Sequence, residues 1–173
     1  MLRLFVGIDP PPELKLSIAT LCVGLPGARW IDAGNYHITL RFIGTADEAL
    51  AADIDAALLR VKAPRFAVTL AGIGSFGGRE LWIGVEKNDA LTHLRDKVES
   101  ALVRLGLEPE GRRFTPHVTL ARLKRGEDRL EAFMRTHALY RAAPFPVAHF
   151  SLVASYLTKA GSVYEDQADY PLR

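Results

Sequence analysis

Tyr-His-Ile-Thr-Leu at residues 36–40 is the stretch that decides the fold, because a close copy, Pro-His-Val-Thr-Leu, stands at residues 116–120. The two histidines, His37 and His117, are 80 positions apart (117 − 37 = 80). Successive side chains of a β-strand point to opposite faces, so each histidine shares a face with the threonine two positions later. The aliphatic residues between and after them occupy the other face. Each copy therefore predicts a strand with an apolar side and a side that carries an imidazole and a hydroxyl.

A single His-x-Thr pattern is most simply explained as a structural histidine in a half-buried strand, because short motifs often match by chance. Two copies at corresponding points of two similar half-chains favour a paired active site instead. If the two strands face each other, their polar sides enclose one pocket. We therefore take as candidate site residues His37 and His117, with Thr39 and Thr119.

The rest of the sequence repeats in a similar order around the two motif strands, which we expect at 37–43 and 117–123. An amphipathic helix follows each of them, and then a strand that begins with Phe-x-Val. These helices are expected at 47–61 and 128–138, and these strands at 66–70 and 145–153. We also expect strands at 2–9, 81–85 and 163–170, helices at 12–21 and 91–105, and a long glycine-rich loop that closes a hairpin between 66–70 and 81–85.

The repeated order indicates an internal duplication. We expect an α+β, bilobal duplicated fold in which two antiparallel sheets are backed by helices, with the motif strands lining a central cleft. Residues 1–173 are expected to form a single domain made of two pseudo-symmetric lobes, and the protein is expected to be a monomer.

The composition is that of an ordinary globular chain, with 49% hydrophobic and 24% charged residues among 173. The formal net charge of +2 indicates no broad electrostatic binding of nucleic acid. Cys22 is the single cysteine, which excludes an internal disulfide and fits a reducing compartment. No segment approaches the roughly 20 apolar residues of a membrane span. We expect a cytoplasmic protein with no membrane partner.

Positive charge is concentrated near the second motif, at Arg112, Arg113, Arg122, Lys124 and Arg125.

Two histidines suit the acid-base chemistry of in-line displacement at a phosphodiester. With an unperturbed pKa of about 6.5, one can accept a proton from water while the other donates one to the leaving oxygen. Each step contributes roughly 10²- to 10⁴-fold. The threonine hydroxyls can donate to phosphate oxygens, and Arg41 or Arg122 can neutralise the remaining charge. Strict alternation places Arg41 on the histidine face and Arg122 on the opposite face. Both lie near strand ends, where a bulge can redirect a side chain, so alternation does not choose between them.

Other uses of these residues fit less well. A metal site would place carboxylate or cysteine ligands near the histidines, and neither histidine has Asp, Glu or Cys within three residues. A Ser-His-Asp triad would use one histidine rather than two equivalent ones. We therefore expect no metal and no cofactor.

Further stretches extend the pattern over nearly the whole chain. They are LFVGIDPP at 4–11, W-x(6)-HITLRFIG at 30–44, LWIGV at 81–85, FTPHVTLAR at 114–122 and Y-x(5)-YPL at 164–172. With these stretches the chain resembles the two-histidine phosphoesterases, and among them the RNA 2′,3′-cyclic phosphodiesterases long called 2′-5′ RNA ligases.

The resemblance implies a bilobal fold with a pseudo-twofold axis and metal-independent hydrolysis of a terminal 2′,3′-cyclic phosphate to a 2′-phosphate. In some members it also implies a reversible 2′-5′ ligation. It assigns His37 as general acid toward the leaving 3′ oxygen, His117 as general base on water, and Thr39 and Thr119 as phosphate donors. Arg122 occupies the family's phosphate-contacting arginine position, which ranks it above Arg41.

The expected partner is RNA with a 2′,3′-cyclic phosphate end or a cyclic nucleotide. Two alternatives stay open. One is a non-catalytic module that binds RNA ends or nucleotides, against which the intact histidines argue, since a sensor needs only the phosphate donors. The other is a cyclic phosphodiesterase for a small nucleotide, which the low net charge favours and the basic run at 112–125 disfavours.

Overall fold

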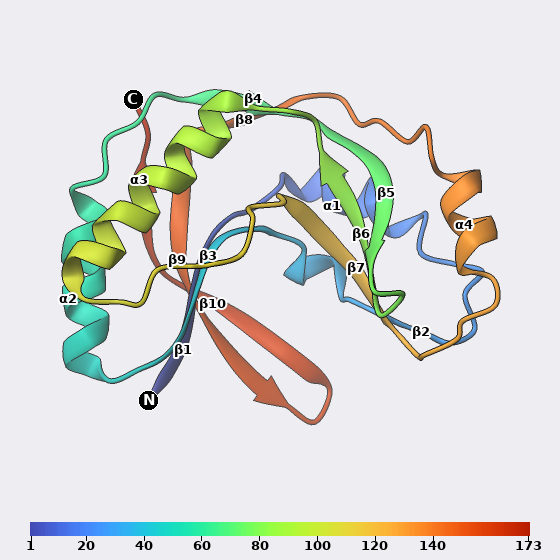
Figure 1. Ribbon diagram of the computed structural model, residues 1–173, viewed down its shortest axis with the longest axis horizontal. Coiled ribbons are helices and arrows are strands. Elements are labelled where there is room, and N and C mark those ends of the chain that lie inside the picture. Colours follow the sequence, from blue (N-terminus) through green and yellow to red (C-terminus); the bar gives the residue numbers. More distant parts are fainter.

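The computed structural model describes residues 1–173 and is built on two four-stranded antiparallel sheets (Figure 1). The first sheet has the strand order β10-β9-β1-β3 and the second has β2-β7-β6-β5. A third, two-stranded sheet joins β4 to β8. The α+β class and the two antiparallel sheets are as predicted. The strands are β1 (Leu2–Ile8), β2 (Ala28–Trp30), β3 (Ile38–Ala46), β4 (Phe66–Val68), β5 (Leu70–Phe76), β6 (Glu80–Val85), β7 (His117–Leu123), β8 (Phe145–Val147), β9 (His149–Thr158) and β10 (Gly161–Pro171).

The four predicted helices are present, and side-chain caps set the starts of two of them, at Asp47 and Asn88. The Asp47 side chain accepts a hydrogen bond from the backbone nitrogen of Leu50, and Asn88 does the same for Leu91. Gly106 ends the longest helix in a left-handed conformation, with φ +115°. None of the helices is long and apolar enough to cross a membrane. The helices are α1 (Pro12–Ala19), the short 3₁₀ helix η1 (Ala33–Asn35), α2 (Glu48–Leu59), α3 (Asp89–Leu105) and α4 (Leu130–Thr136).

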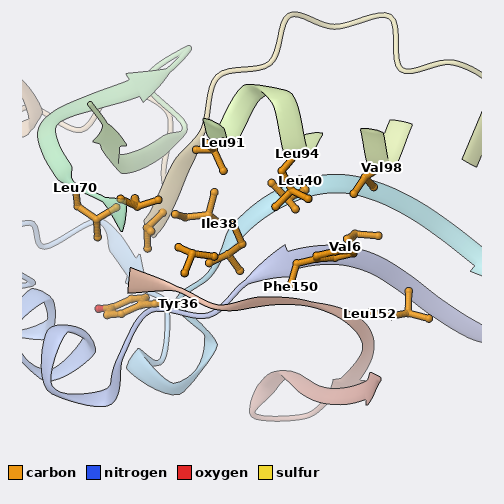
Figure 2. Close-up of a cluster of buried hydrophobic side chains, with 14 of the residues drawn as sticks. Val6, Tyr36, Ile38, Leu40, Leu70, Leu91, Leu94, Val98, Phe150 and Leu152 are labelled. Atoms are coloured by element: carbon orange, nitrogen blue, oxygen red, sulfur yellow. The ribbon is translucent and has the colours of Figure 1, made fainter. Parts of the chain in front are cut away.

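The apolar faces of the two motif strands lie in the hydrophobic core, as the alternation predicted. Ile38 and Leu40 of β3 and Val118 and Leu120 of β7 are all at most 3% exposed. Figure 2 shows α3 laid across the first sheet, with its leucines above the side chains of β3. Because these faces are buried, the histidine and threonine of each motif strand lie on the other face of their sheet, away from the core. The core therefore determines where the site can form.

The two half-chains are interlocked rather than folded separately. The strands that begin with Phe-x-Val pair with each other, with Phe66 opposite Val147 and Val68 opposite Phe145. After β4 the first half-chain crosses to the second sheet, where β5 pairs with β6. After β8 the second half-chain crosses to the first sheet, where β9 pairs with β1. Strand β6 beside β7 is thus the counterpart of β1 beside β3. Each half-chain completes the sheet that carries the other half's motif.

Two sequence-based expectations about the strands were wrong. The segments 66–70 and 145–153 are not single strands, because the chain changes partner near Thr69 and Ala148. The expected long glycine-rich loop is a short turn at 77–79, and β5 continues through Gly72 and Gly74. Gly74 is needed for packing rather than for flexibility, since a Cβ atom there would lie 2.3 Å from the Trp82 ring.

Candidate active site

A cleft of about 370 Å³ between the two sheets contains both His-x-Thr motifs. His37 and Thr39 enter it from β3, and His117 and Thr119 enter it from β7. The structure therefore brings together the four residues that the repeated motif singled out. The cleft also receives side chains from β1, β6 and the β9–β10 hairpin.

The backbone fixes both imidazoles in the same orientation. The Nδ1 atom of His37 lies 2.8 Å from the carbonyl oxygen of Asn35, and that of His117 lies 2.6 Å from the carbonyl oxygen of Thr115. In each strand the acceptor is two residues before the histidine. A carbonyl can only accept, so each Nδ1 carries a proton and each neutral ring has its basic nitrogen at Nε2. Both Nε2 atoms are thus available for proton transfer.

His37 has largely apolar surroundings. Its ring stacks on Phe5 with centroids 4.5 Å apart, and the edge of Tyr164 lies against it at 5.2 Å. Its Nε2 atom lies 2.8 Å from the Thr39 hydroxyl oxygen. Burial lowers the pKa of His37, and the positive charge of His117 acts in the same direction, while the hydrogen bond to Asn35 opposes them. In the empty cleft His37 therefore favours its neutral form.

His117 has a carboxylate as its neighbour. The Nε2 atom of His117 lies 3.5 Å from Oε1 of Glu80. The Thr119 hydroxyl donates to the same oxygen at 2.5 Å, and Nη1 of Arg122 donates to Oε2 at 3.1 Å. The hydrogen bond to His117, aided by Thr119 and the Arg122 charge, lowers the pKa of Glu80 to about 2. Glu80 is therefore ionised at neutral pH, and its negative charge lies beside the imidazole of His117.

A β-bulge in each motif strand reverses the alternation after the threonine. Leu40 has no partner in the register between β1 and β3, and Leu120 has none between β6 and β7. The next side chain, Arg41 in β3 or Ala121 in β7, is therefore buried like the leucine before it. Strict alternation was thus wrong for both arginines.

The two candidate arginines consequently have different surroundings. Arg122 lines the cleft with a side chain that is 62% exposed. Arg41 is 8% exposed; it donates to Glu99 at 3.0 Å, to the carbonyl of Phe42 at 2.7 Å and to the carbonyl of Glu108. Because these three acceptors occupy its guanidinium, Arg41 holds the fold together beside the cleft. Position 42, which corresponds to 122, presents a phenylalanine to the cleft.

Ten of the fifteen residues that line the cleft were not predicted as site residues from the sequence, and three of these lie against a motif histidine: Phe5, Glu80 and Tyr164. Glu80 is placed by the register of β6 against β7, which sets it opposite Arg122. Phe5 takes the matching place in the first sheet, opposite Phe42. No local pattern in the sequence marks either position, because both depend on which residues of two distant strands face each other.

A second groove of about 510 Å³ adjoins the cleft and shares Thr39, Phe42, Glu80 and His117 with it. Two exposed arginines, Arg112 and Arg113, lie along this groove. Its other lining residues include Phe76, which is 39% exposed, and Phe114. Phenyl rings and arginines in series suit nucleotide bases and phosphates.

The residues of the cleft do not form a recognisable metal centre. No group of three or more His, Cys, Asp or Glu side chains lies close enough to hold a metal ion. The motif strands supply the cleft with imidazoles, hydroxyls and a guanidinium, which serve proton transfer and anion binding.

Comparison with known proteins identifies a family model and close relatives. The model described as the 2′-5′ RNA ligase superfamily matches residues 10–158. An RNA 2′,3′-cyclic phosphodiesterase of Aeropyrum pernix is 36% identical over 88% of this chain and 89% of its own length. A protein of the same name from Thermotoga maritima is 32% identical over 95% and 92% of the two lengths.

Solved structures show the same fold. The crystal structure of E. coli LigT complexed with 3′-AMP has a TM-score of 0.83 and 24% identity, and the match covers 99% of this chain and 98% of that one. The crystal structure of a Thermus thermophilus protein, TT0787, gives the same TM-score, identity and coverage. At this identity the likeness establishes the fold alone.

Proposed function

The chain belongs to the 2′-5′ RNA ligase superfamily, and from this premise we propose that it is an RNA 2′,3′-cyclic phosphodiesterase, a hydrolase that opens 2′,3′-cyclic phosphate ends to 2′-phosphomonoesters. The observation that carries the proposal is the paired site. Two imidazoles, each with Nδ1 held by a backbone carbonyl, share one cleft with two threonine hydroxyls and an arginine. Acid-base catalysis of in-line displacement needs two proton-transfer groups and donors to the phosphate oxygens.

We propose that Thr39, Thr119 and Arg122 bind the non-bridging phosphate oxygens. Each hydroxyl lies beside the histidine of its own strand, so a phosphate held by both hydroxyls would lie between the two imidazoles. The Arg122 side chain is exposed to the cleft and can neutralise charge on the phosphate. Arg41 is left out of the proposed phosphate site because its three hydrogen-bonding acceptors belong to the fold.

The resemblance assigns His37 as the general acid and His117 as the general base, and we carry this assignment as the proposal. Burial lowers the pKa of His37, so His37 must gain its proton together with the anionic substrate, whose charge raises the pKa again. Glu80 lies 3.5 Å from Nε2 of His117, whereas aromatic rings surround His37, so the two histidines have unequal surroundings. A substrate that needs no general acid separates this assignment from its reverse.

The same site supports a reversible ligation if a 5′-hydroxyl replaces water as the nucleophile. Attack of that hydroxyl on the cyclic phosphate forms a 2′-5′ linkage and breaks the bond to the 3′ oxygen. One histidine removes the hydroxyl proton and the other protonates the 3′ oxygen, as in hydrolysis. We propose this ligation as a secondary activity of the same residues.

We propose an RNA end rather than a mononucleotide as the substrate. The groove with Phe76, Phe114, Arg112 and Arg113 continues from the cleft past His117, where nucleotides preceding the terminal one can stack and place their phosphates. A small nucleotide would leave this groove unused. A non-catalytic binding module would not need two imidazoles that are both held with Nε2 free of the backbone.

The test is turnover of two substrates side by side, with and without a chelator. We expect hydrolysis of both a nucleoside 2′,3′-cyclic phosphate and an oligoribonucleotide ending in one, a higher kcat/KM for the oligoribonucleotide, and no effect of the chelator. Activity lost with the chelator and restored by a divalent ion would contradict a metal-independent mechanism. Equal kcat/KM for the two substrates would favour the small-nucleotide alternative.

The single domain of residues 1–173, the monomeric state and the cytoplasmic location stay predictions. One set of contacting core side chains includes residues of both sheets, which supports a single unit. Sedimentation equilibrium tests the monomer, and one cooperative unfolding transition tests the single domain.

A further inference from the structure

The Glu80 carboxylate occupies the donors that the proposed mechanism assigns to the substrate phosphate. Its Oε1 atom accepts from the Thr119 hydroxyl at 2.5 Å and lies 3.5 Å from Nε2 of His117. Its Oε2 atom accepts from Nη1 of Arg122 at 3.1 Å. A hydroxyl has one proton to donate, so Thr119 cannot serve Glu80 and a phosphate oxygen at the same time. An anionic ligand in the second lobe must therefore compete with this carboxylate.

The competing carboxylate is confined to one side of the cleft. Glu80 stands opposite Arg122 in the register of β6 and β7, and its side chain is 19% exposed. At the matching position of β1, Phe5 stands opposite Phe42 and stacks on His37. The first lobe thus offers the Thr39 hydroxyl without a neighbouring anion. Only the donors of the second lobe are held by an anion, because in the first lobe the Thr39 hydroxyl donates to the neutral Nε2 of His37 at 2.8 Å.

We propose that Glu80 is a specificity-determining residue that competes with the ligand for the donors of the second lobe and disfavours a phosphomonoester dianion more strongly than a cyclic phosphodiester monoanion. This inference rests on the proposed function, because the two ligands are its product and its substrate. Glu80 would then promote release of the 2′-phosphomonoester after each turnover.

The charge of the two ligands explains the selectivity. A cyclic phosphodiester carries one negative charge, whereas a phosphomonoester carries about 1.5 to 2 near pH 7. The repulsion from a fixed carboxylate grows in proportion to that charge. Three hydrogen-bonding neighbours keep the pKa of Glu80 at about 2, so the carboxylate is ionised near pH 7. The product therefore meets more repulsion than the substrate does.

The experiment compares the wild type with Glu80→Gln, which keeps the side-chain shape and removes the charge. Calorimetry gives the dissociation constant of a nucleoside 2′-monophosphate, and steady-state kinetics give KM for the nucleoside 2′,3′-cyclic phosphate. We expect the monophosphate to bind about 10-fold more tightly, which corresponds to ~1.4 kcal/mol, and KM to fall by about 3-fold or less. Glu80→Ala should show the same order of effects if the glutamine variant folds poorly.

Glu86→Gln is the matched control. Glu86 follows β6 at the surface and pairs with Arg141 at 3.1 Å, so the variant removes the same charge outside the cleft. It should change neither constant by more than about 2-fold, as expected for a screened charge at a distance.

Two results would overturn the proposal: unchanged or weaker monophosphate binding in both Glu80 variants, or equal tightening of both ligands. The first would make Glu80 a positioning residue for His117, and the second would make it a competitor without selectivity. Monophosphate binding is measured without turnover. The two proposals can therefore fail independently. If the wild type does not hydrolyse the cyclic phosphate, the proposed function is refuted. The test of Glu80 then uses the dissociation constant of the cyclic phosphate in place of KM.

Discussion

The two lobes hold their His-x-Thr strands in matching backbone geometry and surround the histidines with different side chains. In both, a carbonyl two residues earlier binds Nδ1, and a bulge follows the threonine. Phe5 and Phe42 lie beside the motif in the first lobe, and Glu80 and Arg122 take the corresponding places in the second. The backbone symmetry brings two similar pairs of side chains to one cleft. The neighbouring side chains then make those groups chemically different.

The largest expected effect tests whether both lobes take part in catalysis. His37→Ala and His117→Ala should each reduce kcat by roughly 10²- to 10⁴-fold, because each removes one of two proton transfers. His93→Ala, which alters an exposed histidine on α3, is the control and should leave kcat unchanged. Steady-state hydrolysis of a nucleoside 2′,3′-cyclic phosphate is the measurement. A variant of either motif histidine with wild-type kcat would limit catalysis to one lobe.

Substitution of Arg41 should lower the stability of the fold, whereas substitution of Arg122 should weaken substrate binding. Arg41→Ala should lower the free energy of unfolding by about 3 kcal/mol, at the low end for a broken buried ion pair, because Arg95 still lies 3.7 Å from Glu99. Arg122→Ala should change the unfolding free energy by less than about 1 kcal/mol, because its side chain is mostly exposed, and should raise KM about 10-fold. Urea unfolding and steady-state kinetics measure these effects. Unchanged stability and a raised KM for Arg41→Ala would return Arg41 to the phosphate site.

The threonines test whether both lobes bind the phosphate. Thr39→Ala and Thr119→Ala should each slow turnover by about 10- to 100-fold, the equivalent of roughly 1.5 to 3 kcal/mol for a hydrogen bond to a charged group. Thr136→Ala, in which the altered hydroxyl bonds the carbonyl of Ala132 on α4, is a control outside the cleft. Unchanged kinetics in both cleft variants would show that neither hydroxyl contacts the substrate.

The smallest expected effects are two separate pH dependences of stability. The folded-state pKa of His37 lies below its ordinary value, so the unfolded chain binds more protons, and stability falls as pH drops below about 6.5. The folded-state pKa of Glu80 is about 2 against an ordinary 4.5, so its contribution is present above pH 4.5 and is lost as pH falls toward 2. Each slope should stay under about 1.4 kcal/mol per pH unit, the limit for one proton.

Urea unfolding across the pH range checks these slopes. His37→Gln should flatten the dependence just below pH 6.5, and Glu80→Gln should flatten the dependence below pH 4.5. If one of these variants removed the pH dependence of stability in both ranges, His37 and Glu80 would be titrating as a coupled pair rather than independently.

Local patterns in the sequence predicted most of the secondary structure and four site residues. Alternation around His37 and His117 predicts the strands, because one face of each is buried and apolar. Apolar residues at steps of three and four predict the helices in the same way, and the acidic residues near 47 predict the start of α2. These features depend on a few neighbouring residues, and the sequence displays those residues directly.

The remaining features depend on contacts between distant segments. The hairpin onto 81–85 was predicted, but the change of partner between β4 and β5 and the pairing of β9 with β1 follow from the crossing of the two half-chains, which no local pattern marks. A bulge in each motif strand determines which arginine reaches the cleft. Glu80 becomes part of the site only through the register of β6 with β7. Strand register and bulges are therefore the features that only the three-dimensional structure reveals.

The measurement that tests the non-equivalence of the two lobes most directly uses an aryl phosphodiester whose leaving oxygen needs no proton. The rates of His37→Ala and His117→Ala on this substrate are compared with their rates on the cyclic phosphate. We predict that loss of the general acid, His37, costs little on the aryl substrate, whereas loss of the general base, His117, still removes most of the rate. Rescue of the His117 variant alone would reverse the two roles. Equal loss in both variants would contradict the account, since it would mean that both histidines act by binding the phosphate.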